Sequence, residues 1–167
     1  MQITGKIKEA LFWLMAGGAF LLMIYNTMLY TRVGIRPEAP VSEIENGTTL
    51  AGFSLKELDG KDFVIPSKGR YLVSFLTTGC GPCQMQVATL NRTSDLGSYD
   101  KVLAVFFEPR AKVEQFKVEF NAEIPCLIDY KATINTRLNL SSFPQTVELD
   151  DGTVIRSWVG VHDSFSD

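Results

Sequence analysis

The sequence predicts an α/β domain, a central mixed β-sheet flanked by helices with a hairpin at its N-terminal end, preceded by one transmembrane helix. Three observations support this fold class. Residues 10–30 are almost entirely apolar. Short apolar runs alternate with amphipathic stretches from residue 71 to residue 139, and hairpin signals stand at Asp59-Gly60 and Asp150-Asp151-Gly152. Strands that alternate with helices and close on a hairpin are typical of a mixed sheet covered by helices.

The apolar stretch at residues 10–30 has the length and composition of a membrane-spanning helix. About 20 apolar residues of helix cross a bilayer core. Trp13 and Tyr30 lie near the two ends, where amphipathic rings favour the interface. A cleaved signal peptide has a shorter apolar core and a small-residue cleavage site, and residues 30–34 offer no such site. We therefore expect an uncleaved anchor in contact with membrane lipid, with residues 1–9 as an N-terminal tail.

The charges beside this stretch give only a weak preference for its orientation. Lys6 and Lys8 precede it, and Arg32 and Arg36 follow it. The rule that places positive residues in the cytoplasm therefore gives a tie. The free N-terminal amine adds a positive charge before the span. We expect a single-pass protein with a cytoplasmic N-terminus and a soluble domain outside the cytoplasm.

The remaining chain divides into a linker and a globular domain. Residues 31–48 contain two prolines, two glycines and no apolar periodicity, which is typical of a linker. The domain spans residues 49–167. Its expected elements are, in order, hairpin strands at 52–55 and 62–65, a strand at 71–77, a helix at 82–95, a strand at 101–107, a helix at 111–121, a strand at 124–128, a helix at 131–139, and strands at 146–149 and 154–159.

The type of each element follows from the spacing of its apolar residues. Continuous apolar runs at 71–77 and 101–107 are typical of strands that are buried on both faces. The stretch at 111–121 carries its apolar side chains at helical spacing on one face. The helix at 82–95 begins with Pro82, which is tolerated there because the N–H groups of a first turn have no helical partner.

The charge balance argues against a nucleic-acid partner. The chain carries 16 Lys and Arg against 19 Asp and Glu, a formal net charge of −3, and the positive charges form no run. Nucleic-acid binding favours a basic patch or stripe. The chain has three cysteines, an odd number, so it is not a scaffold stapled by disulfides.

Two of the cysteines form the motif Cys80-Gly81-Pro82-Cys83, where the strand at 71–77 meets the helix at 82–95. The first sulfur stands at a helix N-terminus, where unpaired N–H groups and the helix dipole favour negative charge. Cysteines in such motifs have a pKa of about 3.5 to 7, and the thiolate is the form that attacks a disulfide. We predict that Cys80 attacks, that Cys83 resolves the mixed disulfide, and that no cofactor is needed.

A metal site is a weaker interpretation of the same cysteines. Zinc usually takes four ligands, and only Cys126 and His162 remain as sulfur or imidazole candidates, without a second close pair. We therefore predict no metal. Cys126 lies in an apolar run, and its simplest interpretation is a small buried hydrophobic residue.

Pro144 follows Phe143 just before the strand at 146–149. The cis isomer costs little at a bond before proline and builds tight turns. A cis bond beside the dithiol would expose the backbone of Phe143 to an incoming polypeptide. The sequence therefore favours a second loop that takes part in binding a partner.

Together these segments resemble the thioredoxin-like superfamily, and most closely its TlpA/ResA-type membrane-anchored thiol–disulfide oxidoreductases. The resemblance covers roughly residues 50–160. The segments that carry it are the opening hairpin at 52–61, the active-site strand and loop at 75–83, the strand Ile124-Pro125-Cys126-Leu127-Ile128-Asp129, the loop Phe143-Pro144-Gln145-Thr146 and the turn Asp150-Asp151-Gly152.

This resemblance implies a thioredoxin fold tethered to a bacterial cytoplasmic membrane, with its domain in the periplasm or outside the cell. It implies an enzyme that reduces or exchanges disulfides of partner proteins, for example during cytochrome c or copper-oxidase assembly. The residues that it places at the substrate surface, around the catalytic Cys80 and Cys83, are Gly79, Gly81, Pro82, Phe143 and Pro144.

Departures from the family pattern favour an alternative function. Gly79 stands where the family usually has Trp, and Ser74 stands where thioredoxins carry a buried Asp for proton transfer to the second thiol. Glu108 is the candidate to replace that acid. Residues 161–167 are too few for the usual closing helix, which would leave a sheet face for a partner to cover. The alternative is an accessory subunit of a membrane complex that uses the domain for docking.

Overall fold

A computed structural model describes residues 3–33 and 43–165 of the chain. The chain divides between residues 40 and 41 into a unit that contains one helix and a unit that contains every described strand. Residues 34–42, which belong to the expected linker, lie outside the described residues. Residues 43–48, at the other end of that linker, belong to the strand-containing unit, where Ile44 is buried.

The first unit is the helix α1 (Ile3–Val33), which begins before the apolar stretch at 10–30 and ends after it. Its segment Leu11–Met28 is long and apolar enough to cross a membrane, by length and composition. Thr27 donates its hydroxyl hydrogen to the Met23 carbonyl oxygen at 2.7 Å, so this hydroxyl is bonded within the helix, as hydrocarbon surroundings require. The helix therefore fits a single-pass membrane anchor.

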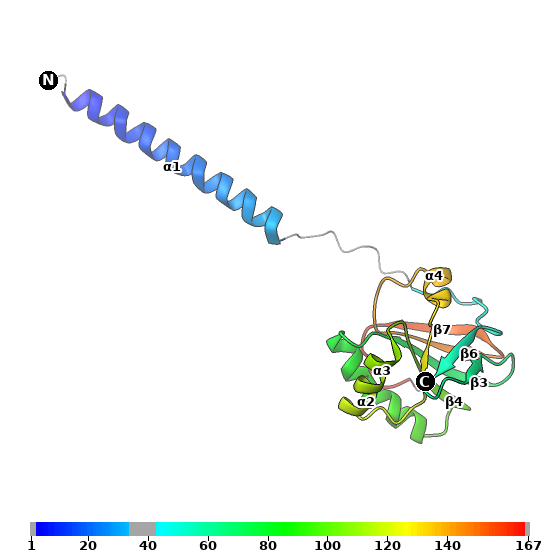
Figure 1. The fold of residues 1–167 in the computed structure, drawn as a ribbon. Helices are drawn as coiled ribbons and strands as arrows, with labels where there is room; N and C mark the ends of the chain where they lie inside the picture. The colour runs from blue at the N-terminus through cyan, green and yellow to red at the C-terminus, as the bar shows by residue number, and fades with distance from the viewer. Residues whose placement is uncertain (1–2, 34–42, 166–167) are drawn as a thin grey trace. The chain divides into compact units, whose positions relative to one another are not determined.

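The second unit is built on one sheet of seven strands (Figure 1). The strands are β1 (Ser54–Glu57), β2 (Asp62–Val64), β3 (Arg70–Leu76), β4 (Lys101–Phe106), β5 (Cys126–Ile128), β6 (Gln145–Asp150) and β7 (Thr153–Val159). Their order across the sheet is β2-β1-β5-β4-β3-β6-β7. Strands β3, β4 and β5 run parallel, whereas the β1–β2, β1–β5, β3–β6 and β6–β7 pairs are antiparallel.

Three helices connect the strands in the predicted order. Helix α2 (Gly81–Asp95) links β3 to β4, α3 (Arg110–Glu119) links β4 to β5, and α4 (Thr133–Leu138) stands between β5 and β6. Figure 1 shows α2 and α3 side by side, in green and yellow-green, against the sheet. The mixed sheet between two hairpins, flanked by helices, confirms the predicted fold class.

Several element boundaries differ from the prediction by one or two residues, and those of the first strand and of α4 follow from the local backbone conformation. The first strand begins at Ser54 rather than residue 52, because Gly52 has a φ of +82° and turns the chain. Helix α4 is shorter than the predicted 131–139 because Ala132 and Asn139, each with a φ of +49°, adopt the left-handed conformation at its two ends. A residue in this conformation interrupts the helical hydrogen-bond pattern.

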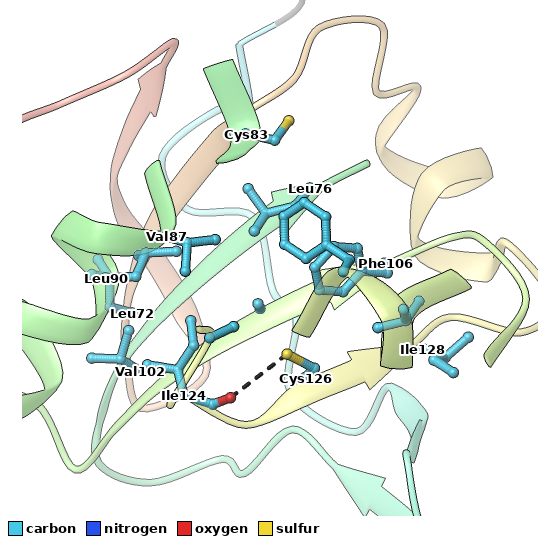
Figure 2. Packing of buried hydrophobic residues seen from close by; sticks show 14 of the residues in the cluster. Leu72, Leu76, Cys83, Val87, Leu90, Val102, Phe106, Ile124, Cys126 and Ile128 are labelled. Atoms are coloured by element: carbon cyan, nitrogen blue, oxygen red, sulfur yellow. Dashed lines mark hydrogen bonds between the residues drawn. The ribbon is translucent and has the colours of Figure 1, made fainter. Parts of the chain in front are cut away.

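The face of the sheet that α2 and α3 cover holds the first of two hydrophobic clusters (Figure 2). Leu72 and Phe106 belong to it from the sheet, and Val87 and Phe116 from the helices. The rings of Phe106 and Phe116 meet edge to face with centroids 5.2 Å apart, an arrangement that the ring quadrupoles favour. Cys83 is part of this cluster, so the second sulfur of the motif lies on the α2 side of the sheet.

The opposite face carries the second cluster. Val73 and Phe75, which alternate along β3 with residues of the first cluster, meet Ile134 of α4 and Leu50 there. Burial on both faces explains why β3 is a continuous apolar run instead of an alternating one. The two hydrophobic clusters, one on each face of the sheet, therefore explain the apolar sequence of β3.

The segment after β7, residues 160–165, packs against α2, and we call it the closing segment. The Gln86 side chain accepts the backbone N–H of His162 at 2.9 Å and donates to the carbonyl oxygen of the same residue at 3.3 Å. Phe165 is 4% exposed and meets Trp158 edge to face, with centroids 5.1 Å apart. The expectation that this region leaves a sheet face uncovered is therefore wrong in part, because Phe165 fills the first cluster.

Replacement of Gly152 by Ala is expected to lower the free energy of unfolding by about 2–4 kcal/mol, from left-handed strain and overpacking together. Gly152 has a φ of +75°, and a Cβ atom there would lie 2.6 Å from the Ala51 Cβ and 2.9 Å from the Pro66 carbonyl oxygen. The measurement is chemical unfolding of the full chain in detergent.

Gly60 provides a matched control for this variant. It has a φ of +92°, but a Cβ atom there would meet nothing within 4 Å. Gly60→Ala is therefore expected to cost only the backbone strain, about 1–2 kcal/mol. Equal losses in the two variants would show that the close approach at Gly152 contributes nothing.

Candidate functional site

The two cysteines of the motif lie where β3 ends and α2 begins. Cys80 is the N-cap of α2, with an extended backbone (φ −101°, ψ 112°), and its Sγ accepts the backbone N–H of Cys83 at 3.1 Å. Pro82 occupies the first turn, where its missing N–H leaves no hydrogen bond unmade. The N-terminus of α2 thus directs an N–H at the first sulfur, an arrangement that stabilises a thiolate.

Cys80 and Cys83 form a disulfide, with their Cα atoms 5.1 Å apart. The two residues differ in access, because Cys80 is half-buried whereas Cys83 is 0% exposed. Figure 2 shows Cys83 on α2 above Leu76, at the edge of the first cluster. A molecule arriving from solution can therefore reach the first sulfur and not the second.

The loop before β6 forms the second side of the site. The Phe143–Pro144 peptide bond is cis, and the Sγ of Cys80 lies 3.5 Å from the Phe143 carbonyl oxygen. The Phe143 ring packs against Phe107 with centroids 5.7 Å apart. The structure therefore brings together Cys80 and the loop that the sequence places 63 residues further on.

Two glycines and a proline surround Cys80 on the outside. Gly79, Gly81 and Pro82 are all exposed. The other predicted surface residues differ in access, since Phe143 is half-buried and Pro144 is buried. The three exposed residues thus form an open rim next to Cys80, with the Phe143 carbonyl as one wall beside its sulfur.

A third loop, which was not predicted from the sequence, is tied to the loop of Pro144. Gly160, directly after β7, has a φ of +90° and donates its N–H to the Pro144 carbonyl oxygen at 2.9 Å. The only signal in the sequence is a glycine at the end of the last predicted strand. The hydrogen bond holds the loop of Pro144 against the closing segment.

Glu108, the candidate for proton transfer, lies at the end of β4 beside the loop that precedes Cys80. Its carboxylate accepts the backbone N–H of Thr78 at 2.8 Å and that of Phe107 at 3.2 Å. Thr78 stands two residues before Cys80, so the carboxylate fixes the approach to the first cysteine. This contact is positional, and proton transfer by Glu108 stays a prediction.

Ser74 stands where the thioredoxin pattern has a buried acid, and it is 0% exposed. Its hydroxyl lies 2.9 Å from the Thr146 hydroxyl, and either oxygen can be the donor. The pair joins β3 to β6, where the two residues are opposite each other in the register. A neutral hydroxyl pair therefore occupies this place in the core.

Cys126, the third cysteine, is 4% exposed on β5, with its Sγ 3.6 Å from the Ile124 carbonyl oxygen. Burial raises the pKa of its thiol to about 11. In Figure 2, Leu76 and Phe106 lie between this sulfur and Cys83. The environment matches the interpretation of Cys126 as a small buried hydrophobic residue.

No metal site accompanies the dithiol in the part of the chain that the structure describes. Among residues 3–33 and 43–165, no three His, Cys, Asp or Glu side chains come together as a group that could hold a metal ion.

Comparison with known proteins identifies relatives of the chain. A scan against models of protein families finds no match. The thioredoxin-like protein YneN of Bacillus subtilis (strain 168) is 32% identical over 120 residues, which make up 68% of this chain and 70% of that protein. Sporulation thiol-disulfide oxidoreductase A of the same strain is 25% identical over 148 residues, covering 84% of this chain and 89% of that protein.

The solved structures agree at the level of the fold. The crystal structure of StoA from Bacillus subtilis matches with a TM-score of 0.58 at 23% identity, over 66% of this chain and 88% of that chain. The chain belongs to the thioredoxin-like thiol–disulfide oxidoreductases. This confirms the resemblance that the sequence motifs carry, and an oxidoreductase activity accords with it.

Cys126 is expected to resist alkylation by iodoacetamide at pH 8 in the reduced, folded chain, whereas Cys80 reacts. With a pKa raised to about 11 by burial, the thiolate appears only as the pH approaches that value, and about one Cys126 in a thousand is ionised at pH 8. Mass spectrometry of the digested protein measures the two sites, and denaturant should expose both. Equal labelling of Cys126 and Cys80 under native conditions would contradict this.

Replacement of Glu108 by Gln is expected to lower the free energy of unfolding by about 1–2 kcal/mol. The new Nε2 donor would face one of the two N–H groups that the carboxylate now accepts, and that bond would be lost. Thermal unfolding of the full chain measures the effect. Glu114→Gln is the control, because Glu114 forms only an exposed ion pair with Arg110, and such pairs contribute little. Similar losses in both variants would mean that Glu108 does not fix the loop.

Proposed function

We propose that this chain is a membrane-tethered thiol–disulfide oxidoreductase that reduces or exchanges disulfides of extracytoplasmic partner proteins through Cys80 and Cys83. The observation that carries the proposal is the difference between the two sulfurs. Cys80 caps α2 within reach of solvent, beside the Phe143 carbonyl, and Cys83 is fully buried behind it. An exposed attacking sulfur and a shielded resolving sulfur suit a reaction in two steps.

In the first step, the Cys80 thiolate attacks one sulfur of a partner disulfide, forms a mixed disulfide and releases the other partner sulfur as a thiolate that takes up a proton. In the second step, Cys83 loses its proton and attacks the Cys80 sulfur. This releases the second partner thiol and leaves the Cys80–Cys83 disulfide. Two electrons thus pass to the partner, and a dithiol reductant must supply them again before the next cycle.

The rim around Cys80 is the proposed binding surface for the partner. Gly79, Gly81, Pro82, Phe143 and Pro144 surround the first sulfur. The absence of side chains at the glycines allows a partner backbone to approach. Glu108 is proposed to take part in proton transfer to or from the dithiol, in addition to holding the loop at Thr78.

The location of the domain is also part of the proposal. Helix α1 supports a single membrane span with residues 10–30 in lipid. With the N-terminus in the cytoplasm, as proposed from the free N-terminal amine, this span would place the domain in the periplasm or outside the cell. Disulfides of proteins persist in such oxidising compartments. Partner proteins of cytochrome c assembly are the class that the family resemblance suggests.

A docking subunit of a membrane complex is the second candidate. Gly79 and Ser74, where related proteins carry an aromatic and an acid, favour it. The closing segment weakens it, because Phe165 and Gln86 cover part of the surface that a partner subunit was expected to fill.

The deciding experiment measures reduction of insulin disulfides by the full chain in detergent, with dithiothreitol as the regenerating reductant. The wild type should accelerate the reaction, and Cys80→Ser should abolish the acceleration because the attacking sulfur is lost. Cys83→Ser, reduced beforehand and mixed with insulin after dithiothreitol has been removed, should accumulate a protein–insulin mixed disulfide, visible on a non-reducing gel, because the resolving sulfur is lost. Cys126→Ala is the control and should retain the activity. An inactive wild type with an intact Cys80–Cys83 pair would favour the docking subunit.

A further inference from the structure

Neither the backbone nor the packing of the domain requires a glycine at position 79, directly before Cys80. Gly79 is not among the glycines with a positive φ, and a Cβ atom built on it would meet nothing within 4 Å. Gly152 differs on both counts, since its φ is positive and a Cβ atom there would collide with Ala51. Within the domain, a Cβ atom at position 79 would therefore fit without strain.

The space that Gly79 leaves open belongs to a hollow between the active-site loop and α3. This hollow has a volume of about 320 Å³ and is lined by Thr78 and Gly79 on one side and by α3 on the other. Phe116 and Phe120 form its apolar part, with ring centroids 4.8 Å apart. Phe116 is 2% exposed and is anchored in the first cluster, so this wall is rigid.

The polar residues around the hollow indicate an uncharged occupant. Lys112, in the first turn of α3, and Glu119, at its end, carry opposite charges and both line the hollow. A charged occupant would therefore be attracted by one residue and repelled by the other. An apolar side chain avoids this conflict and gains contact with the ring of Phe120, which is the partly exposed one of the two.

The hollow is continuous with the place where a partner must bind. In the proposed mixed disulfide the partner is joined to Cys80, whose neighbour Gly79 lines the hollow. One extended residue spans about 3.3–3.6 Å, so a side chain one or two residues from the partner cysteine reaches it. On the basis of the proposed function, we propose that this hollow is a specificity subsite, which Gly79 keeps open for a bulky apolar side chain beside the reactive cysteine of the partner.

The expected discrimination is about tenfold or more between a bulky apolar residue and alanine, the range typical of apolar pockets. A tryptophan at position 79 should abolish it, because the indole would occupy the hollow. A tryptophan at Gln115, which lines the hollow from α3, should have the same effect from the other wall. The two substitutions, one in the active-site loop and one on α3, thus test the same hollow.

The test uses the full chain in detergent with Cys83→Ser, so that only the first step occurs. The probes are short synthetic peptides whose single cysteine is joined to thionitrobenzoate, with Phe or Ala at each of the two positions on either side. The Cys80 thiolate attacks the peptide sulfur, and thionitrobenzoate leaves as a coloured thiolate, which gives the rate. The readout is the ratio of the Phe rate to the Ala rate, in which any change in Cys80 reactivity cancels.

We expect a ratio of about ten or more for Phe at one of the four positions, and a ratio near one in Gly79→Trp and Gln115→Trp. Val118→Trp is the matched control, because Val118 is 83% exposed on the same helix and does not line the hollow. This variant should keep the preference for Phe.

Equal rates for all peptides, or a preference that survives both tryptophan substitutions, would overturn the subsite while leaving the proposed function intact. A chain that reacts with no peptide would overturn the proposed function itself. A dimer that Gly79→Trp dissociates would identify a second copy of the chain as the occupant and would also overturn the subsite.

Discussion

The hydrogen bond from the Cys83 backbone N–H to the Cys80 sulfur is the contact on which the rest of the site depends. It places the first sulfur at the positive end of α2, and the rigid sheet places that helix end, because β3 is buried on both of its faces. The same turn carries Cys83 into the first cluster. One helix start thus sets the position of both sulfurs and the difference in their access to solvent.

Three loops lie near this helix start, and each is tied by a hydrogen bond to one of its backbone groups. Glu108 holds the loop before Cys80 through the Thr78 N–H, and Gly160 holds the loop of Pro144. Gln86 joins α2 to the closing segment. The loops lie far apart in the sequence, so the site needs the strands that carry them, β3, β4, β6 and β7, to be in place.

The sequence was sufficient for the parts of this arrangement that are local. The strand before Cys80, the helix after it and the hairpin turns each have signals within a few neighbouring residues, and the structure has them in the predicted order. Contacts between distant residues left no such signal. Gln86 and His162 are 76 residues apart. Nothing in the residues next to a buried glutamine indicates which distant group it binds. The left-handed conformation of Ala132, which shortens α4 at its start, was equally impossible to predict because alanine rarely adopts it.

The hydroxyl pair of Ser74 and Thr146 has a consequence for how the core responds to charge. A carboxyl group at this place would be able to take up and release a proton inside the core. Two hydroxyls carry no net charge, and since either oxygen can donate, their dipoles can reverse when the charge nearby changes. At that point the core of this domain therefore carries a dipole that can reorient and no group that stores a proton, so a proton lost by the dithiol has no carboxyl acceptor there.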